Sequence, residues 1–215
     1  MQTDICAGEG YLNVEFSDGT GDARTYAFSI LNADDSPVSG YASGGNITTP
    51  GSGTYPVAVD KLPVGSYKMK LTTKTEAGCS SVPAVMNFTV HEKPEITKLS
   101  VAKPGVCEGN DIMASFNSSM DVKYSYKVVG KPAITGSVDT YASSATFNVA
   151  TATLTATGSP YTLELITETE HGCKDTATVQ FAIYPIPTLT GATPVKAENI
   201  CFGDAMATVT CSPDA

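Results

Sequence analysis

Tryptophan is absent from this 215-residue chain, and histidine occurs only twice, as His91 and His171. So few imidazoles argue against an elaborate acid–base or metal centre, because histidine is the usual residue for both tasks near neutral pH. Charged residues make up only 16% of the chain, and their balance leaves a net charge of −9. An acidic chain lacks the basic face that nucleic acid requires and the attraction to anionic lipids. We therefore expect no nucleic-acid partner.

Long apolar runs are also missing. None approaches the roughly 18 residues of a membrane-spanning helix, so we expect no membrane insertion by this segment. The first 20 residues lack the charged and apolar regions of a signal peptide. The six cysteines form no CxxC pair and stand at no zinc-finger spacing from a histidine, which favours disulfides in an oxidising compartment. We expect an excerpt from a longer extracellular or cell-surface chain, with Met1 as an expression start.

The sequence is self-similar. Four landmarks recur in the same order, about 94 to 101 residues apart. They are a Cys-x-Gly (Cys6, Cys107, Cys201), a Tyr-Ala-Ser (Tyr41, Tyr141), a tyrosine twelve residues before a Gly-Cys (Tyr67 and Cys79, Tyr161 and Cys173), and a closing proline (Pro94, Pro187). Such self-similarity indicates repeated structural units. We predict a repeat at 1–93 with its first strand largely missing, a complete repeat at 94–186, and the start of a third at 187–215.

Apolar and polar residues alternate through segments such as 25–31, 66–75, 122–129 and 161–169, with Gly-, Ser- and Asp-rich turns between them. This period of two indicates strands, and about seven short strands per repeat predict an all-β chain of tandem immunoglobulin-like (PKD-like) β-sandwich domains. Tyr67 and Tyr161 open the penultimate strands, where a tyrosine corner is expected. The expected core positions are Leu12, Val14, Phe16, Tyr26, Phe28, Ile30, Tyr67, Met69, Leu71, Ile112, Ala114, Phe116, Tyr124, Tyr126, Tyr161, Leu163 and Leu165.

Together, the Cys-x-Gly before the second strand, the tyrosine of the penultimate strand, the Gly-Cys after it and the proline-rich exit resemble a known family. They are similar to the Ig-like or PKD-like tandem repeats of large Bacteroidetes cell-surface adhesins, of the gliding-motility adhesin and type IX secretion cargo type. The resemblance covers essentially all of the chain. One departure is the missing strand-C tryptophan, in whose region Tyr124, Tyr126 or Tyr26 stands. The resemblance implies a secreted, surface-anchored stalk or adhesin filament.

No catalytic residues are expected. His171 and Cys173 lie close together, but in a tight turn with no third group to orient the imidazole, and no nucleophile motif occurs. We therefore expect no enzyme, no resident metal and no cofactor.

Two weaker binding signals remain. Asp18, Asp22, Asp34 and Asp35 lie in turns of repeat one and are weak calcium candidates without a counterpart in repeat two. Tyr41 and Tyr141 are candidate platforms for a ligand such as a glycan.

Two functions follow from these observations. The first is a structural or adhesive segment of a repetitive extracellular stalk, whose partners are neighbouring repeats of the same chain. The alternative is a module that binds a surface glycan or protein through loops at one pole, with residues 32–55 as the candidate loop.

The cysteines allow several pairings. If Cys107 precedes the second strand and Cys173 follows the sixth, the two lie at opposite poles of one sandwich, roughly 30 Å apart. A disulfide needs Cα atoms about 4.4–6.8 Å apart, so Cys6–Cys173 across the junction of two repeats is favoured. Cys79 and Cys107 would then be free here, with Cys201 in the same kind of turn as Cys107. Bonds within repeats, Cys6–Cys79 and Cys107–Cys173, and fully reduced thiols stay open as alternatives.

Overall fold

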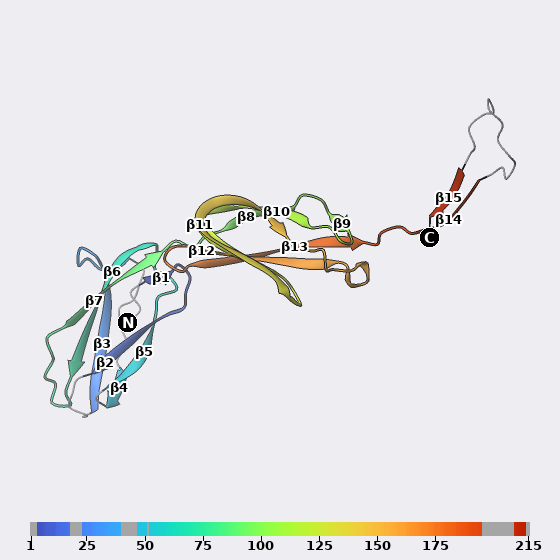
Figure 1. Ribbon diagram of the computed structural model, residues 1–215. Helices are drawn as coiled ribbons and strands as arrows, with labels where there is room; N and C mark the ends of the chain where they lie inside the picture. The colour runs from blue at the N-terminus through green and yellow to red at the C-terminus, as the bar shows by residue number, and fades with distance from the viewer. Residues whose placement is uncertain (1–3, 18–22, 40–46, 51, 195–208, 214–215) are drawn as a thin grey trace.

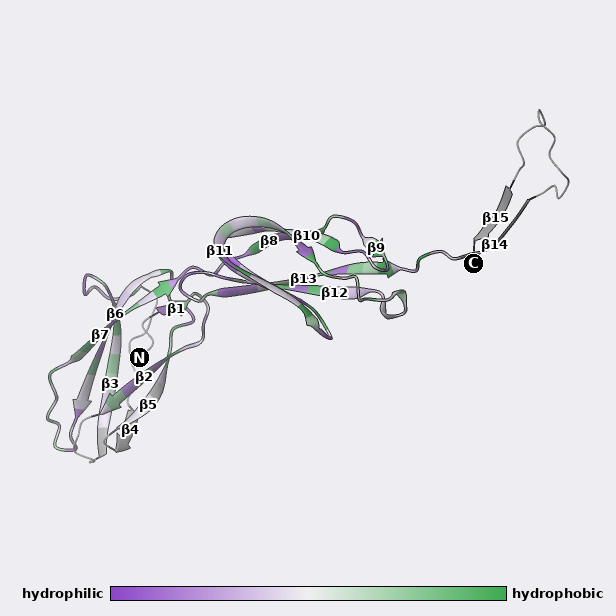
Figure 2. Ribbon diagram, in the orientation of Figure 1, coloured by the Kyte–Doolittle hydropathy of each residue, from purple (hydrophilic) through white to green (hydrophobic). Residues whose placement is uncertain are grey.

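The computed structural model describes residues 4–17, 23–39, 47–50, 52–194 and 209–213. Fifteen strands and one 3-10 turn, η1 (Ala156–Gly158), make up the secondary structure of these residues. No helix among them is long and apolar enough to cross a membrane. The all-β prediction is confirmed. Apolar and polar residues are interspersed along the strands rather than gathered in blocks (Figure 2).

The N-terminal part of the chain forms a two-layered sandwich (Figure 1). One layer has the strand order β1-β7-β6-β3-β4, and the other pairs β2 with β5. β1 runs parallel to β7, and the other pairs are antiparallel. The strands are β1 (Asp4–Cys6), β2 (Tyr11–Ser17), β3 (Ala23–Asn32), β4 (Ile47–Pro50), β5 (Ser52–Ala58), β6 (Gly65–Lys74) and β7 (Ala84–His91).

A second sandwich follows, built from β8 (Ile96–Val101), β9 (Gly105–Cys107), β10 (Ile112–Val128), β11 (Lys131–Val149), β12 (Tyr161–Glu168) and β13 (Lys174–Tyr184). The first part of β10 pairs with β8 and with the end of β11, and its last part pairs with β12 and with the start of β11. A register shift between Asn117 and Val122 separates the two parts, so β10 passes from one layer into the other.

Both sandwiches share the same strand arrangement. The first sandwich contains the strand order β1-β7-β6-β3, and the second contains the corresponding order β9-β13-β12-β10. β9 is parallel to β13, as β1 is to β7, and Cys107 opposite Tyr184 corresponds to Cys6 opposite His91. This order, with a short parallel strand at one edge, is that of an immunoglobulin-like sandwich. At the C-terminal side, β14 (Leu189–Pro194) pairs antiparallel with β15 (Val209–Pro213). The domain boundaries at 93 and 186 stay predictions.

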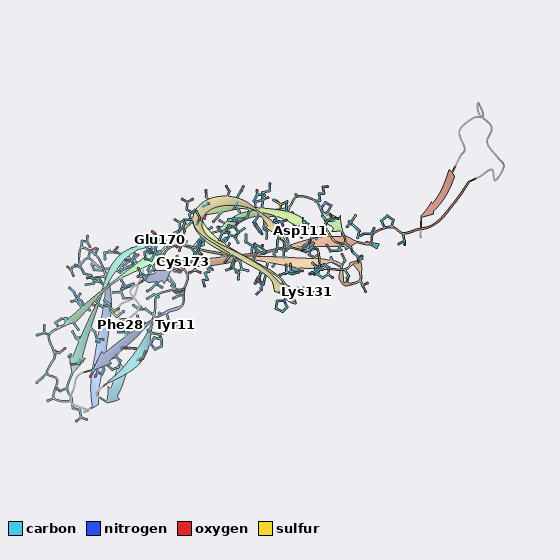
Figure 3. All side chains as sticks on the ribbon, in the orientation of Figure 1. Tyr11, Phe28, Asp111, Lys131, Glu170 and Cys173 are labelled. Carbon is cyan, nitrogen blue, oxygen red and sulfur yellow. A yellow bond between two sulfur atoms is a disulfide. The ribbon has the colours of Figure 1, made fainter. Side chains whose placement is uncertain are left out.

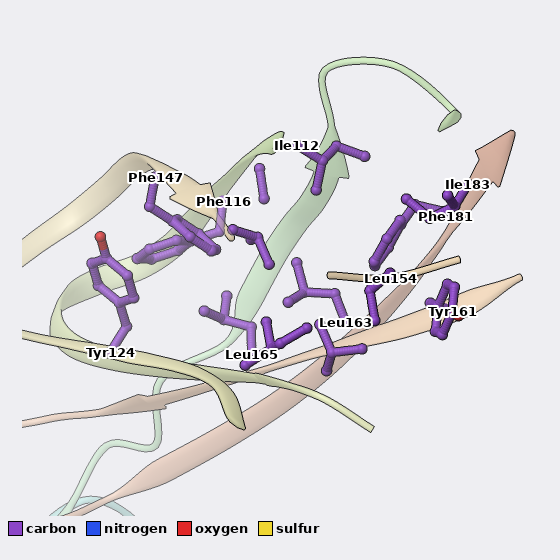
Figure 4. Close-up of a cluster of buried hydrophobic side chains, with 14 of the residues drawn as sticks. Ile112, Phe116, Tyr124, Phe147, Leu154, Tyr161, Leu163, Leu165, Phe181 and Ile183 are labelled. Atoms are coloured by element: carbon purple, nitrogen blue, oxygen red, sulfur yellow. The ribbon is translucent and has the colours of Figure 1, made fainter. Parts of the chain in front are cut away.

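The core lies between the two layers of each sandwich. Figure 4 shows the core of the second sandwich. Most expected core residues are buried, including Leu12, Ile30, Leu163 and Leu165, each fully enclosed. Four are only half-buried: Phe16, Phe28, Leu71 and Tyr126. Phe16 and Leu71 line an open hollow at the far end of the N-terminal sandwich, where the layers separate.

Both predicted tyrosine corners are present. The Tyr67 hydroxyl donates to the carbonyl oxygen of Pro63 at 2.7 Å, and the Tyr161 hydroxyl to that of Thr155 at 2.9 Å. Each ring is buried beside a phenylalanine, Phe88 or Phe181, so the phenol combines apolar burial with a satisfied polar tip. The corner ties the penultimate strand to the loop before it.

Candidate functional site: the junction between the sandwiches

The two sandwiches lie end to end and meet at a short linker (Figure 1). β7 ends at His91 and β8 begins at Ile96, which leaves four residues between them. The end of the linker is held by the second sandwich, because the Ile96 amide donates to Asp175 Oδ2 at 2.7 Å and the Ser119 amide donates to the Glu95 carbonyl at 2.9 Å. These bonds fix the C-terminal end of the linker to the second sandwich.

A disulfide crosses this junction. Cys6 at the end of β1 is bonded to Cys173 in the β12–β13 turn, with a Cα–Cα distance of 5.5 Å. Both half-cystines are buried, and Figure 3 labels Cys173 and the neighbouring Glu170 where the sandwiches meet. The junction pairing expected from the sequence is confirmed.

The alternatives, bonds within repeats and full reduction, are wrong. Cys6 lies beside the last residue of β7, whereas Cys79 precedes its first. Cys107 and Cys173 are separated in the same way by the length of β13. An eleven-residue strand spans about 35 Å, so no bond within that sandwich can form.

Backbone hydrogen bonds shape the turn that presents Cys173. The Thr169 amide donates to the Cys173 carbonyl at 2.9 Å, the Gly172 amide to the Thr169 carbonyl at 3.0 Å, and the Cys173 amide to Thr169 Oγ1 at 3.1 Å. Gly172 has φ 82°, a left-handed conformation that glycine adopts without strain. The turn therefore holds the cysteine in one fixed position.

The turn that carries Cys79 has the same hydrogen bonds, at 3.0, 2.9 and 3.1 Å, with Thr75 in place of Thr169. The turns after Cys6 and Cys107 also match, since each cysteine carbonyl accepts an amide three residues on, from Glu9 or Asn110. Cys79 and Cys107 are exposed free thiols, as expected, yet they sit in the same turn shapes as the bonded pair. Cys201 lies outside the described residues.

Three potential metal ligands also meet at the junction. His91 Nε2 is 2.7 Å from Asp4 Oδ1, and the rings of His91 and His171 stack with centroids 3.6 Å apart. One ligand atom from each of Asp4, His91 and His171 lies within 4.8 Å of the others, and no other such group of three occurs among the residues described. Sequence reasoning missed this cluster because its members are far apart along the chain, and only the folded junction unites them.

A hollow of about 530 Å³ opens beside the two histidines. Tyr141, one of the two candidate platform residues, contributes to its wall and is 43% exposed. Tyr41 lies outside the described residues. The remaining lining residues are His91, Glu92, Met120, Asp121, Thr169, Glu170 and His171. Three of these are carboxylates, so the hollow has an acidic wall.

The weak calcium candidates are not gathered into a cation site in the described structure. Asp35 oxygens lie 2.9 Å from Lys68 Nζ and 2.9 Å from Lys70 Nζ. Hydrogen bonds to these two ammonium groups lower the pKa of Asp35 to about 2. Asp34 Oδ1 accepts bonds from the amide and hydroxyl of Ser36 within its own turn. Asp18 and Asp22 lie outside the described residues.

The His171–Cys173 pair offers no nucleophile in this structure, because the Cys173 sulfur is bonded to Cys6 and carries no thiol. The glutamates of β12 also form ion pairs, Glu164 with Lys127 at 2.7 Å and Glu168 with Lys123 and Lys174. Burial raises the pKa of Glu168, but hydrogen bonds from Lys174 and Lys123 outweigh it and keep the pKa below its usual value.

Comparisons with known proteins give structural similarity only. No family model matches the chain, and no curated protein sequence does. Among solved structures, the fibronectin(III)-like modules of Clostridium thermocellum CbhA align over 86% of this chain and 90% of theirs, at 12% identity and a TM-score of 0.42.

Two further structures are similar at this level. A Ca²⁺-stabilized adhesin with which an Antarctic bacterium binds ice aligns over 88% of this chain and 48% of its own, at 16% identity and a TM-score of 0.42. This chain thus spans about half of that adhesin structure. Chicken CNTN1 FN1-FN3 domains align over 84% of this chain and 68% of theirs, at 14% identity and a TM-score of 0.40.

Proposed function

We propose that this chain is a segment of a repetitive extracellular stalk or surface adhesin, with a structural or adhesive role rather than a catalytic one. The observation that carries the proposal is the buried disulfide Cys6–Cys173, which joins two end-to-end sandwiches across their junction. A covalent bond at this place limits bending between neighbours, and a stalk requires such stiffness. The bond also suits the oxidising environment outside the cell.

The two free cysteines extend this proposal to a longer array. Cys79 has the turn of Cys173 and Cys107 has the turn of Cys6, so each is one half of the same junction bond displaced by one repeat. In a chain with further repeats of this kind, Cys107 bonds to the β12–β13-type turn of the following sandwich. Cys79 bonds in the same way to the sandwich before it. Every junction then carries such a disulfide, and each sandwich of the stalk is covalently cross-linked to both of its neighbours.

The landmark residues support a finer assignment within this function. The Cys-x-Gly, the corner tyrosines and the Gly-Cys turns resemble repeats of Bacteroidetes adhesins of the gliding-motility and type IX secretion cargo type. In that setting the segment is exported and displayed at the cell surface, and its partners are neighbouring repeats. Adhesive contacts are then made by other parts of the parent chain.

Small-angle X-ray scattering of the oxidised and reduced chain tests the stalk function. We expect an extended particle of fixed length in the oxidised form, and a broader distribution of lengths after mild reduction of Cys6–Cys173 with both sandwiches still folded. A mutant with Cys79→Ser and Cys107→Ser is the matched control, because it removes thiols from the same turns and keeps the junction bond. If reduction leaves the distribution unchanged, the disulfide does not stiffen the junction, and the proposal loses its support.

The hollow beside Tyr141 favours the second candidate, a module that binds glycan or protein. An exposed tyrosine beside hydrogen-bonding groups is a suitable surface for a sugar ring. A glycan array with the intact chain and with Tyr141→Ala separates the candidates. Binding that is lost in Tyr141→Ala indicates a binding module. An array without hits leaves the structural role as the better account.

A further inference from the structure

We propose that Asp4, His91 and His171 form a binding site for a divalent transition metal ion, Zn²⁺ in the first instance, at the junction between the two sandwiches. This inference replaces the expectation from the sequence that no metal is bound, and it does not depend on the stalk function. The donor set is two imidazole nitrogens and one carboxylate oxygen. Zinc is commonly bound by such ligands, and three protein ligands leave its fourth position for water.

The three ligands come from three segments that the fold holds in place. Asp4 begins β1, His91 ends β7, and the two strands are hydrogen-bonded in parallel. His171 belongs to the β12–β13 turn of the other sandwich. The disulfide lies two residues beyond Asp4 and two residues beyond His171, so it fastens both flanks of the cluster. Folding and the disulfide have therefore already brought these segments together, so ion binding has to order them little further.

The distances require only a small adjustment. Ligand atoms around a tetrahedral zinc ion, each about 2.0–2.2 Å from it, lie roughly 3.3 Å from one another. Here Asp4 Oδ1 and His91 Nε2 are 2.7 Å apart, and all three ligand atoms are within 4.8 Å. The imidazoles are stacked at an interplanar angle of 15°, so one ring must rotate for both lone pairs to point at a shared ion. His171 has the freedom to do so, because its side chain is 42% exposed, against 16% for His91.

The surrounding charge favours a cation. Glu170 Oε1 lies 3.3 Å from His171 Nε2, and Glu92 and Asp121 line the adjoining hollow. Together with Asp4 these groups supply four carboxylates around two imidazoles. The cluster is also particular to this junction. Gly105 stands at the place of Asp4 and Tyr184 at that of His91 in the second sandwich, so the carboxylate and the imidazole of the cluster have no counterpart there.

Zinc binding to a tag-free chain tests the site. The free thiols are first alkylated without reducing agent, because exposed Cys79 and Cys107 could bind zinc themselves. Equilibrium dialysis against micromolar ZnCl₂ with elemental analysis should then give one zinc per chain. We expect His171→Ala and Asp4→Asn each to weaken binding by about tenfold or more. Asp34→Asn, a neutralised carboxylate outside the cluster, should bind zinc as the parent chain does.

Nuclear magnetic resonance provides a readout at the ligands themselves. The chain has only two histidines, so its imidazole ¹⁵N signals belong to His91 and His171 alone. Both should shift on addition of zinc and return on chelation. The proposal is overturned if the alkylated chain retains no zinc, or if His171→Ala retains it with unchanged affinity while circular dichroism shows an intact β fold. Unshifted imidazole signals at full zinc occupancy would place the ion elsewhere and overturn it equally.

Discussion

Replacing Cys6 and Cys173 together by serine should destabilise the N-terminal sandwich. With the second sandwich folded, Cys173 is anchored next to the linker at Ile96, whose amide donates a hydrogen bond to Asp175. An unfolded N-terminal sandwich therefore remains a closed loop from Cys6 to the linker, roughly 90 residues long. The chain-entropy relation gives an upper value of about 4.5 kcal/mol for such a loop, and measured disulfides typically contribute about 2–4 kcal/mol.

We expect the double serine variant to lose about 2–4 kcal/mol in the free energy of unfolding of the N-terminal sandwich. Because the chain lacks tryptophan, unfolding is best followed in urea by hydrogen exchange and mass spectrometry, which resolves peptides of β6 from those of β12. The matched control is Cys79→Ser with Cys107→Ser, which removes two exposed thiols and closes no loop. The control should stay within about 0.5 kcal/mol of the parent chain.

Two results would refute this reasoning. One is a junction variant as stable as the control, since the loop then contributes nothing. The other is a Cys6–Cys79 or Cys107–Cys173 peptide in non-reducing peptide mapping, which would contradict both the disulfide and the strand topology.

Three other changes have defined outcomes. Leu163→Ala removes a fully enclosed side chain and should cost about 2–5 kcal/mol in denaturant melts, and a loss under about 0.5 kcal/mol would mean that the residue faces outward. Tyr161→Phe and Tyr67→Phe keep the ring and leave a carbonyl without its donor, so each should cost about 1 kcal/mol by the same measurement, and an unchanged midpoint would refute the corner's contribution. The Asp35 carboxyl should titrate near pH 2 by carbon resonance, because its pKa is lowered to about 2 by Lys68 and Lys70. Since its folded pKa lies below the unfolded value, the ion pairs stabilise the fold fully above about pH 4 and lose this effect as the pH falls through 2. Lys68→Ala should move the titration toward the usual aspartate pKa of 3.8, and a midpoint that stays near 2 would contradict the pairing.

Much of the fold was predictable because its signals are local. The alternation along 161–169 placed Leu163 and Leu165 correctly in the core, and the position of Tyr161 at a strand start indicated its corner hydrogen bond. The disulfide was also favoured by the sequence, because strand length, together with the expected immunoglobulin-like topology, argues against pairing within a repeat. Alternation could not show that Phe16 and Leu71 lie where the layers open, because strand periodicity gives the face of a residue and not its depth.

The cluster of Asp4, His91 and His171 could not be predicted from the sequence, for a different reason. Asp4, His91 and His171 share no motif, and they meet only through the relative position of two sandwiches. Local patterns describe each sandwich separately and contain nothing about how two of them are oriented. A site made by docking two units therefore becomes visible only when the junction itself is known.

The junction disulfide also determines how this chain would respond to pulling. Tension applied at the two ends passes through the sulfur–sulfur bond from Cys6 to Cys173 and bypasses the 167-residue stretch that the bond encloses. That stretch would span roughly 550 Å if drawn out fully, and the closed loop keeps all of this length from being released. Under load, the force passes instead along β13, which contributes Phe181 and Ile183 to the core of the second sandwich, and through the segments beyond it. The bond therefore limits how far the chain can extend, even when a sandwich momentarily opens.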